Sequence, residues 1–454
     1  MVKRTVYFFL FVFSFLLASC SKREYVNSLP KDSQLVAQID VVDLFQKAGF
    51  EDEKISGVLQ ELIHHPEHVG IDWNEKVYAY VSNNTMGFVA AVNDADKLTG
   101  FLEKHAKALG VTLDVDGDYT WASTDMLLVG YNDEQLLAMT IYGDGKVFRQ
   151  RARKFMKQDV ADSFVSNPSF QKIEASSSDL SIYAVASVLP ESILGKWLAF
   201  LPDNIGLNGL YTILVADFNT GKLDAGINFY SDNPEIQESI KNLSSSLKLQ
   251  NGVFLDHIPS DFSLYGSLCC TPELVSFLKK NRETGMAMEL IAQVVPFYEL
   301  LDNLEDVAFY TSSSGDFMTY GQLKNTDFLT NDSWASKYGI RMLGNHSYAF
   351  GSYSFGLNAD VFYLSSNPQW RDRVDATYQN DLLVSWADKV KDTYGFVMVN
   401  LPKMLEVPFL PSEIRNQLEI AAIRWTQPEH FELTVCVKNQ RDNVLKVLLQ
   451  PWIK

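Results

Sequence analysis

Residues Leu29–Gly49 read LPKDSQLVAQIDVVDLFQKAG, and residues Ile258–Lys280 read IPSDFSLYGSLCCTPELVSFLKK. Both stretches begin with an apolar residue, proline, one variable residue and aspartate, continue as a strand-like apolar run, and end as a helix-like run. Segments that begin at Asp179 and Asp392 share the core of this pattern without the leading proline. Repetition on this scale indicates copies of one structural unit, which here is a strand, a tight turn and a helix.

The segments that follow these four units also recur. Residues 74–94 and 303–325 follow the first and third units and look like hairpins of alternating strands, whereas residues 209–243 and 421–449 look like a hairpin followed by an amphipathic helix. This order indicates a tandem duplication with halves at residues 29–255 and 256–454. The fold predicted is α+β, with a mixed or antiparallel sheet in each half and helices packed on one face.

The N-terminus has the three parts of a secretory signal. Residues 1–4 are basic, residues 6–17 are an apolar core, and Ala18 and Ser19 are small. The apolar run is shorter than the ~20 residues that an ordinary membrane-spanning helix needs.

The sequence FLLASC at Phe15–Cys20 ends this run on a thiol, and Leu17–Cys20 resembles the lipobox of bacterial lipoproteins. The resemblance implies a signal peptide at residues 1–19 that is cleaved before Cys20, and a Cys20 that carries diacylglycerol and an acylated amino group. Residues 20–28 are then a lipidated tether. A plain secretory signal with a chance cysteine is the alternative.

Charge excludes some partners. Cleavage removes Lys3 and Arg4 and leaves 37 Lys and Arg against 56 Asp and Glu, a net charge of −19. Such a chain is not expected to bind nucleic acid by neutralising phosphates, nor to lie on an anionic membrane by its own surface. The membrane is therefore expected to be contacted through the lipid on Cys20.

Three features together are similar to a family of uncharacterised lipoproteins common in Bacteroidota, known only as a domain of unknown function. They are the lipobox, the Leu29–Gly49 opening, and the segment HVGIDWNEKVYAYV with Gly70-Ile71-Asp72 and the strand Val77–Val81. The resemblance implies an outer-membrane lipid anchor in the cell envelope and supplies no catalytic residues. Surface-displayed lipoproteins of these bacteria tend to carry several acids after the cysteine, whereas residues 21–24 are Ser-Lys-Arg-Glu, so an anchor facing the periplasm is expected.

The stretch HHPEHVGID contains His64, His65, Glu67, His68 and Asp72. His64 and His68 have the i, i+4 spacing that could place two metal ligands on one helix face. Pro66 opposes this geometry, because a helix is expected to end before it. The interpretation favoured is a solvated helix end, and a metal site at His64 and His68 is the alternative.

Other candidate sites have structural explanations. Asp114, Asp116 and Asp118 resemble a calcium loop, but Tyr119 stands where an EF-hand needs glycine, so a hairpin is favoured. Adjacent Cys269 and Cys270 are expected to point to opposite faces of a strand as small buried side chains, and their redox state stays open. The repeated aspartates Asp32, Asp179, Asp261 and Asp392 are expected to accept backbone N–H groups at strand starts. The scattered tryptophans are expected in cores, although an exposed pair could bind a sugar or a peptide.

No Walker loop, G-x-G-x-x-G, H-E-x-x-H or G-x-S-x-G motif occurs. The function expected is therefore a lipid-anchored cell-envelope protein that acts as a binding or assembly module without catalytic residues or a cofactor. Its partners are expected to be the membrane, through Cys20, and an envelope protein or glycan. The alternative is a glycan-directed envelope hydrolase that uses two facing carboxylates about 5–9.5 Å apart.

Overall fold

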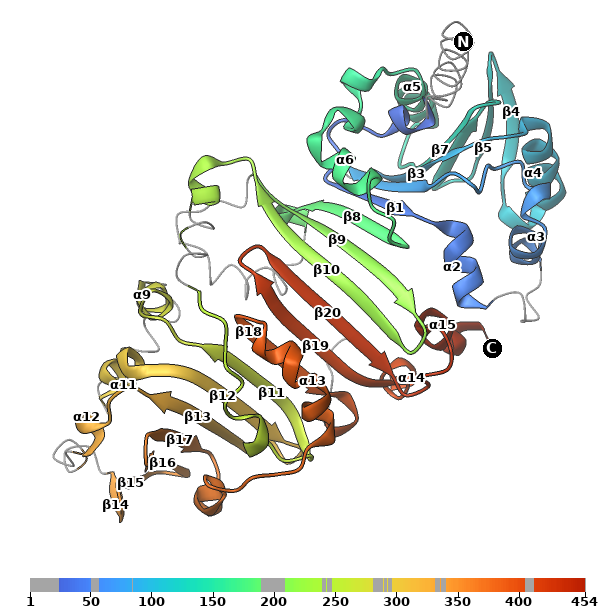
Figure 1. Cartoon of the computed structure of the whole chain (residues 1–454). Coiled ribbons are helices and arrows are strands. Elements are labelled where there is room, and N and C mark those ends of the chain that lie inside the picture. Colours follow the sequence, from blue (N-terminus) through green and yellow to red (C-terminus); the bar gives the residue numbers. More distant parts are fainter. Residues whose placement is uncertain are drawn as a thin grey trace, which may run out of the picture. The chain divides into compact units, whose positions relative to one another are not determined.

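The computed structural model describes residues 24–49, 57–83, 85–188, 209–238, 247–280, 296–330, 340–404 and 412–453, with a few isolated residues between these ranges. The chain divides into two compact units (Figure 1). Unit 1 comprises residues 1–43 and 54–177, and unit 2 comprises residues 44–53 and 178–454. The expected boundary between sequence halves, at 255/256, lies inside unit 2, so compact units and sequence halves divide the chain differently.

Unit 1 contains a seven-stranded antiparallel sheet in the order β1-β2-β3-β7-β6-β5-β4. The strands are β1 (Leu35–Ile39), β2 (Val77–Ser82), β3 (Thr85–Ala91), β4 (Thr112–Asp116), β5 (Tyr119–Ser123), β6 (Leu127–Tyr131) and β7 (Gln135–Thr140). The two strand-like runs of residues 74–94 form the hairpin β2–β3, as predicted. Asp116 pairs with Tyr119 across a two-residue turn, which confirms the hairpin predicted at Asp116-Gly117.

The described helices of unit 1 include α4, which has a capping residue at each end. They are η1 (Glu24–Ser28), the first residues of α2 (Val41–Ala48), α3 (Val58–His64), η3 (Pro66–His68), α4 (Ala95–Leu109), α5 (Gly145–Met156), η4 (Val160–Asp162), η5 (Phe164–Ser166) and α6 (Pro168–Glu174). The side chain of Asp94 caps α4 by accepting from the N–H of Lys97, and Gly110 ends the helix at a φ of 66°. Both ends of α4 therefore have the capping residues that their sequence supplies.

The described residues of unit 2 contain thirteen antiparallel strands in the order β8-β9-β10-β20-β19-β18-β11-β12-β13-β17-β16-β15-β14. The strands are β8 (Leu180–Val185), β9 (Leu210–Asn219), β10 (Lys222–Ser231), β11 (Phe262–Cys269), β12 (Leu304–Ser312), β13 (Phe317–Leu323), β14 (Arg341–Gly344), β15 (Ser347–Phe350), β16 (Tyr353–Asn358), β17 (Val361–Ser365), β18 (Gly395–Asn400), β19 (Leu418–Gln427) and β20 (His430–Val437). The hairpins predicted after the second, third and fourth repeat units are β9–β10, β12–β13 and β19–β20.

The helices of unit 2 lie between these strands in the chain. They are η6 (Ala186–Val188), η7 (Leu255–His257), α9 (Pro272–Lys280), α11 (Phe297–Asn303), α12 (Asp327–Thr330), η9 (Pro368–Arg373), α13 (Asp381–Lys391), η10 (Leu401–Lys403), α14 (Ser412–Arg415) and α15 (Val444–Ile453). Among the described residues, no helix is long and apolar enough to cross a membrane.

Helices cover both faces of the sheet in each unit. In unit 1, Leu136 of β7 shares a cluster with α4, while Trp121 of β5, on the opposite face, lies under Arg149 and Arg153 of α5. In unit 2, Tyr363 of β17 joins a cluster with α13, and its neighbour Phe362 joins a second cluster with α11 and α12. The prediction that helices pack on one face is therefore wrong.

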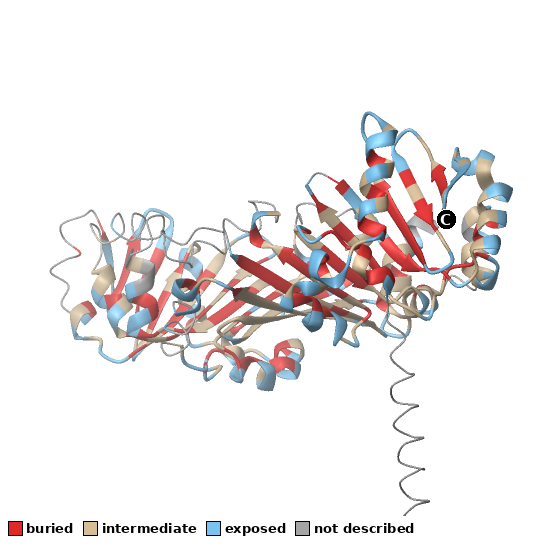
Figure 2. Cartoon of the chain, turned by 90° about the horizontal axis from the view of Figure 1, so that it is seen from above, coloured by how far each residue is buried: buried red, intermediate tan, exposed pale blue. Residues whose placement is uncertain are grey.

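The reason lies in the strands themselves. Residues Leu136–Met139 of β7 are four consecutive apolar residues, and all four are buried. Because successive side chains of a strand point to opposite faces, such a run needs a cover on both sides. Figure 2 shows the same pattern, with buried residues concentrated on the strands and exposed residues on the outer sides of the helices.

Candidate functional site

Residues 24–28, shortly after the lipobox, are part of the folded structure. Cys20 lies outside the described residues, which begin at Glu24. The expected tether covered residues 20–28, but Glu24–Ser28 form η1, and Tyr25, Val26 and Ser28 are buried. Residues 24–28, expected to be part of the tether, are therefore folded into unit 1.

Side-chain hydrogen bonds hold this first turn in unit 1. The hydroxyl of Tyr25 donates to the backbone oxygen of Lys76 at 2.8 Å, and the hydroxyl of Ser28 donates to Gln135. The amide of Gln158 donates to the backbone oxygens of Asn27 and Leu29. A lipid at Cys20 would thus be four positions from this folded turn, a separation that the chain can span by at most about 14 Å.

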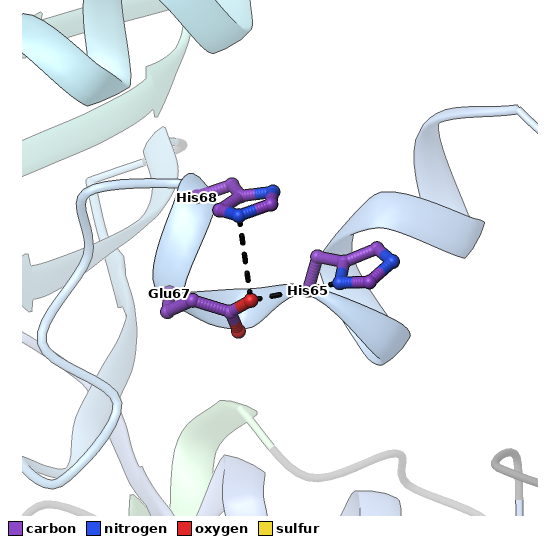
Figure 3. A group of neighbouring side chains, drawn as sticks. All are labelled: His65, Glu67 and His68. Atoms are coloured by element: carbon purple, nitrogen blue, oxygen red, sulfur yellow. Dashed lines mark ion pairs between the residues drawn. The ribbon is translucent and has the colours of Figure 1, made fainter.

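His65, Glu67 and His68 form the one group of three metal-ligating side chains found among the described residues (Figure 3). Nδ1 of His65 and Nε2 of His68 each lie 3.5 Å from Oε1 of Glu67. The two imidazole rings stack at 5.1 Å between centroids, and all three side chains are exposed. The pKa of Glu67 is lowered, chiefly by a hydrogen bond from its own backbone N–H and then by the neighbouring histidines.

Local backbone geometry explains which histidines meet. Pro66 ends α3 at His64, as predicted, and the chain continues into the 3-10 turn η3. A 3-10 helix has three residues per turn, so side chains three positions apart eclipse one another. His65 and His68 have that spacing, whereas the expected pair His64 and His68 does not. The signal that could have revealed the group is the i, i+3 pair around a proline, not an i, i+4 pair on a helix.

The group matches the donor set of a zinc site. Two ligands held about 2.0–2.1 Å from a tetrahedral zinc ion lie roughly 3.4 Å apart, close to the two observed separations of 3.5 Å. Two imidazoles and one carboxylate would leave a fourth position for water. Because the group is exposed, water competes for every ligand atom, and only modest affinity is expected.

A second ionic cluster lies between α3 and α4. Oε2 of Glu61 accepts from Nζ of Lys104 and contacts Nε2 of His105, both at 2.7 Å. These hydrogen bonds, first Lys104 and then His105, lower the pKa of Glu61 from 4.5 to about 2. The cluster joins two helices that pack on one face of unit 1, so its role is structural.

Protonation of Glu61 is expected to account for part of the loss of stability of unit 1 at low pH. Because the folded-state pKa is lowered, its stabilising contribution is complete above about pH 4.5 and is lost as the pH falls towards 2. The melting temperature of Glu61→Gln should therefore fall less than that of the unaltered protein over this interval. Glu103→Gln, on an exposed position of α4, is the matched control. Parallel melting curves for Glu61→Gln and the unaltered protein would contradict the assignment.

The calcium-like acids have cationic partners instead. Asp114 and Asp116 of β4 form ion pairs with Arg149 and Arg153 of α5. Both guanidinium groups also lie over the ring of Trp121, at 5.8 and 5.6 Å from its centroid. The hairpin interpretation of this stretch is therefore confirmed, with its acids fastening α5 to the sheet.

The cysteines of the folded part are free thiols. Burial raises the pKa of Cys269 to about 11 and that of Cys270 to about 12, and it also raises the pKa of Cys436. Such thiols are protonated near neutral pH and react slowly. Cys270 and Cys436 pack against separate hydrophobic clusters, which agrees with their interpretation as apolar side chains.

Two of the repeated aspartates have visible structural roles. Asp32 accepts from the hydroxyl of Ser82 at 2.7 Å. Asp179, which is buried, accepts from the backbone N–H of Phe218 at 2.7 Å and pairs with Lys47 at 2.6 Å. Among the tryptophans, Trp121, Trp370 and Trp386 are buried in cores, as expected.

Comparison with solved structures gives only remote likenesses. Crystal forms I and III of TP0453 share 10% and 9% sequence identity with this chain, each with a TM-score of 0.31. They cover 50% of this chain, which in turn covers 87% and 88% of theirs. The DNA polymerase III β chain from Streptococcus pneumoniae has 7% identity, coverages of 89% and 99%, and a TM-score of 0.13. TM-scores this low do not establish a shared fold.

A search of curated proteins finds no match. A family model, in contrast, matches residues 25–424, from the first buried tyrosine of η1 into β19. The chain belongs to the family described as "Domain of unknown function (DUF4836)", in agreement with the resemblance to an uncharacterised family seen in its sequence.

Proposed function

We propose that this protein is a lipid-anchored component of the bacterial cell envelope that binds or assembles partners without catalysis. The observation that carries the proposal is the position of the fold relative to the lipobox. The turn Glu24–Ser28, which starts four positions after Cys20, is already fixed in unit 1 by buried side chains. A lipid on Cys20 would hold such a unit directly at the membrane, with the outer membrane and its periplasmic side as the proposed location.

A tandem duplication is part of this proposal. The strand order β1-β2-β3-β7-β6-β5-β4 of unit 1 recurs in unit 2 as β11-β12-β13-β17-β16-β15-β14. The remaining strands also form two equivalent sets, β8-β9-β10 and β18-β19-β20. Gly130 of β6 and Gly356 of β16 lie on equivalent strands of the two seven-stranded sets. Two copies of one scaffold supply two related surfaces for partners.

The glycan-directed hydrolase remains the alternative. It requires two facing carboxylates about 5–9.5 Å apart, one of them available as an acid. Several carboxylates of the described residues serve other roles, since Asp114, Asp116 and Asp179 form ion pairs with basic side chains. No contact found among the described residues favours this alternative over binding.

Incubation with isolated envelope glycans and proteins distinguishes the two functions. We expect a partner that cosediments or crosslinks with the protein and is recovered chemically unchanged. Mass spectrometry of the recovered glycans supplies the readout. Shortened glycan fragments that accumulate with time would contradict the non-catalytic proposal and favour the hydrolase.

A second candidate function is capture of a divalent metal by His65, Glu67 and His68. The observation that favours it is the 3.5 Å spacing of their ligand atoms. Transition-metal cations such as zinc or copper suit two imidazoles and one carboxylate. This group differs from the metal site considered in the sequence, which paired His64 with His68.

Zinc titration followed by calorimetry and melting tests this site. His65→Ala or His68→Ala should lose binding, while His64→Ala, which removes the adjacent histidine outside the group, should retain it. At zinc concentrations 100 times the dissociation constant, binding to the folded state alone should add about 2.7 kcal/mol to the stability of unit 1. Equal zinc binding by all three variants, or none by the unaltered protein, would remove this function.

A further inference from the structure

Helix α5 and the two residues after it carry an unusual charge for this acidic chain. Residues 145–158 read GKVFRQRARKFMKQ, with six cationic side chains and no acid, whereas the whole chain has 39 Lys and Arg against 56 Asp and Glu. Acids flank this stretch but do not interrupt it, since Asp144 caps the helix through the N–H of Lys146 and Asp159 follows its end. The positive charge is therefore concentrated on one element of unit 1.

The cations divide between two sides of the helix. Phe148, Ala152, Phe155 and Met156 are buried, and Arg149 and Arg153 fasten the helix to the sheet, as described above. The exposed residues of the opposite side are Lys146, Val147, Gln150 and Lys154. At 100° per residue these four fall within one helical face, whereas Lys157, which follows the helix, has its ammonium group over the ring of Tyr119 at 5.7 Å. Ion pairs among the described residues involve neither Lys146 nor Lys154. We call this side the outer face of α5.

Exposed apolar side chains adjoin the outer face at its N-terminal end. Val147 is 58% exposed and Tyr142 is 56% exposed, with the Tyr142 ring held against Phe148 at 5.0 Å between centroids. Met126 is 75% exposed, and its backbone oxygen accepts from the N–H of Ile141, next to Tyr142. Lysines beside exposed aromatic and aliphatic groups are the composition of a helix that lies in a membrane interface.

The other end of α5 adjoins the start of the fold. The side-chain amide of Gln158 donates to the backbone oxygen of Asn27, within η1, and to that of Leu29, directly after η1. Cys20 precedes Glu24 by four positions, a separation that the chain can span by at most about 14 Å. An anchored lipid would thus hold the membrane surface close to this end of α5.

We propose that the outer face of α5 lies on the anionic lipid surface of the membrane in which Cys20 is anchored. This inference rests on the proposed lipid anchor and adds an orientation to it. The anchor supplies the stable attachment and a high local concentration of lipid headgroups, so a few lysines suffice to orient unit 1. Without the anchor, the acidic remainder of the chain opposes adsorption to the same surface.

Fluorescence quenching by brominated lipids tests the orientation in the lipidated full-length mature protein. A fluorophore is attached to Gln150→Cys, on the outer face, or to Lys107→Cys, on α4 and therefore on the opposite face of the unit 1 sheet. The native thiols of the folded part react slowly, so each label is specific. Vesicles contain either phosphatidylcholine alone or phosphatidylcholine with 30% phosphatidylglycerol, and flotation of the vesicles reports anchoring independently.

We expect strong quenching at Gln150→Cys and little at Lys107→Cys in the anionic vesicles, with a loss of the difference in 0.5 M salt. Lysines near such a surface each favour contact by about fivefold, so Lys146→Glu with Lys154→Glu should lower the membrane-facing population more than about tenfold. Lys107→Glu with Lys403→Glu makes the same charge change at exposed sites elsewhere and should leave quenching of the Gln150→Cys label unchanged.

The outcomes separate this inference from the anchor on which it rests. Flotation together with equal quenching at the two labels, or quenching at Gln150→Cys that survives the reversal of Lys146 and Lys154, overturns the orientation and leaves the anchor intact. Failure of the protein to float with either kind of vesicle overturns both. Melting curves of the lysine variants exclude unfolding as the cause of a lost signal.

Discussion

Cys20→Ala is expected to transfer the protein from the membrane fraction to the soluble fraction. The described helices include no membrane-spanning candidate, and the chain without residues 1–19 has a net charge of −19. Each buried methylene of an acyl chain contributes about 0.8 kcal/mol to membrane attachment, so several chains on one residue hold the protein stably. Loss of the thiol removes the attachment point of these chains, and the variant is expressed behind an ordinary cleavable secretory signal so that residues 1–19 are not retained as an apolar anchor.

Membrane fractionation followed by immunoblotting measures this change. Cys436→Ala is the matched control, because it removes a thiol of β20 that packs against a core cluster. It should leave the protein in the membrane fraction. If Cys20→Ala stayed membrane-bound after a high-salt wash, the attachment would have another origin, and the function proposed here would lose its anchor.

Gly70→Ala is expected to destabilise unit 1 strongly. Gly70 adopts a φ of 80°, and a Cβ atom there would lie 2.2 Å from the backbone oxygen of Asp94 and 2.7 Å from the backbone nitrogen of Leu98. The oxygen of Gly70 also accepts the N–H groups of Asn93 and Asp94 at the start of α4. Alanine would have to adopt a left-handed conformation and displace this helix end, at a combined cost of about 3 kcal/mol or more.

Gly100→Ala is the matched control for this prediction. Gly100 lies inside α4, and a Cβ atom there would contact nothing within 4 Å. The same substitution should therefore stabilise the helix by about 0.5–1 kcal/mol. For a unit of this size, the melting temperature should fall by about 6–12 °C in Gly70→Ala and rise by about 1–4 °C in Gly100→Ala. Similar shifts for the two variants would show that the close approach at Gly70 has no energetic consequence.

Gly70 also shows what the sequence could reveal. It belongs to the motif Gly70-Ile71-Asp72, one of the features shared with the family. In the structure, the backbone oxygen of Gly70, just after η3, accepts hydrogen bonds from the residues that precede α4. The hairpins of both units and the boundary of α4 followed from alternation, turn residues and capping residues. These signals are local, so they were predicted before any tertiary contact was known.

Features that depend on tertiary contacts were missed. The burial of Tyr25 and Val26 has no local signal, because it results from packing against residues 50 or more positions away. In the sequence, the only sign that helices cover both faces of the sheet is the apolar run Leu136–Met139, which is typical of a strand buried on both faces. The histidine group was missed because a 3-10 turn brings together a spacing different from that of an α-helix.

Net charge likewise concealed a local feature. The value of −19 predicted no attraction to an anionic membrane, and this remains the expectation for the chain as a whole. The outer face of α5 differs because six cations fall in 14 consecutive residues, and contacts within unit 1 engage four of them while Lys146 and Lys154 stay exposed. A sum over the sequence cannot show which charges share a face.

The central claim is the lipid on Cys20, and the mass of the N-terminal peptide tests it most directly. Protein extracted from envelopes with detergent is digested, and its first peptide is identified by mass spectrometry. The account predicts a peptide that begins at Cys20 and carries a thioether-linked diacylglycerol and an acylated amino group. A mature protein that begins at another residue, or that has an unmodified Cys20, would contradict it.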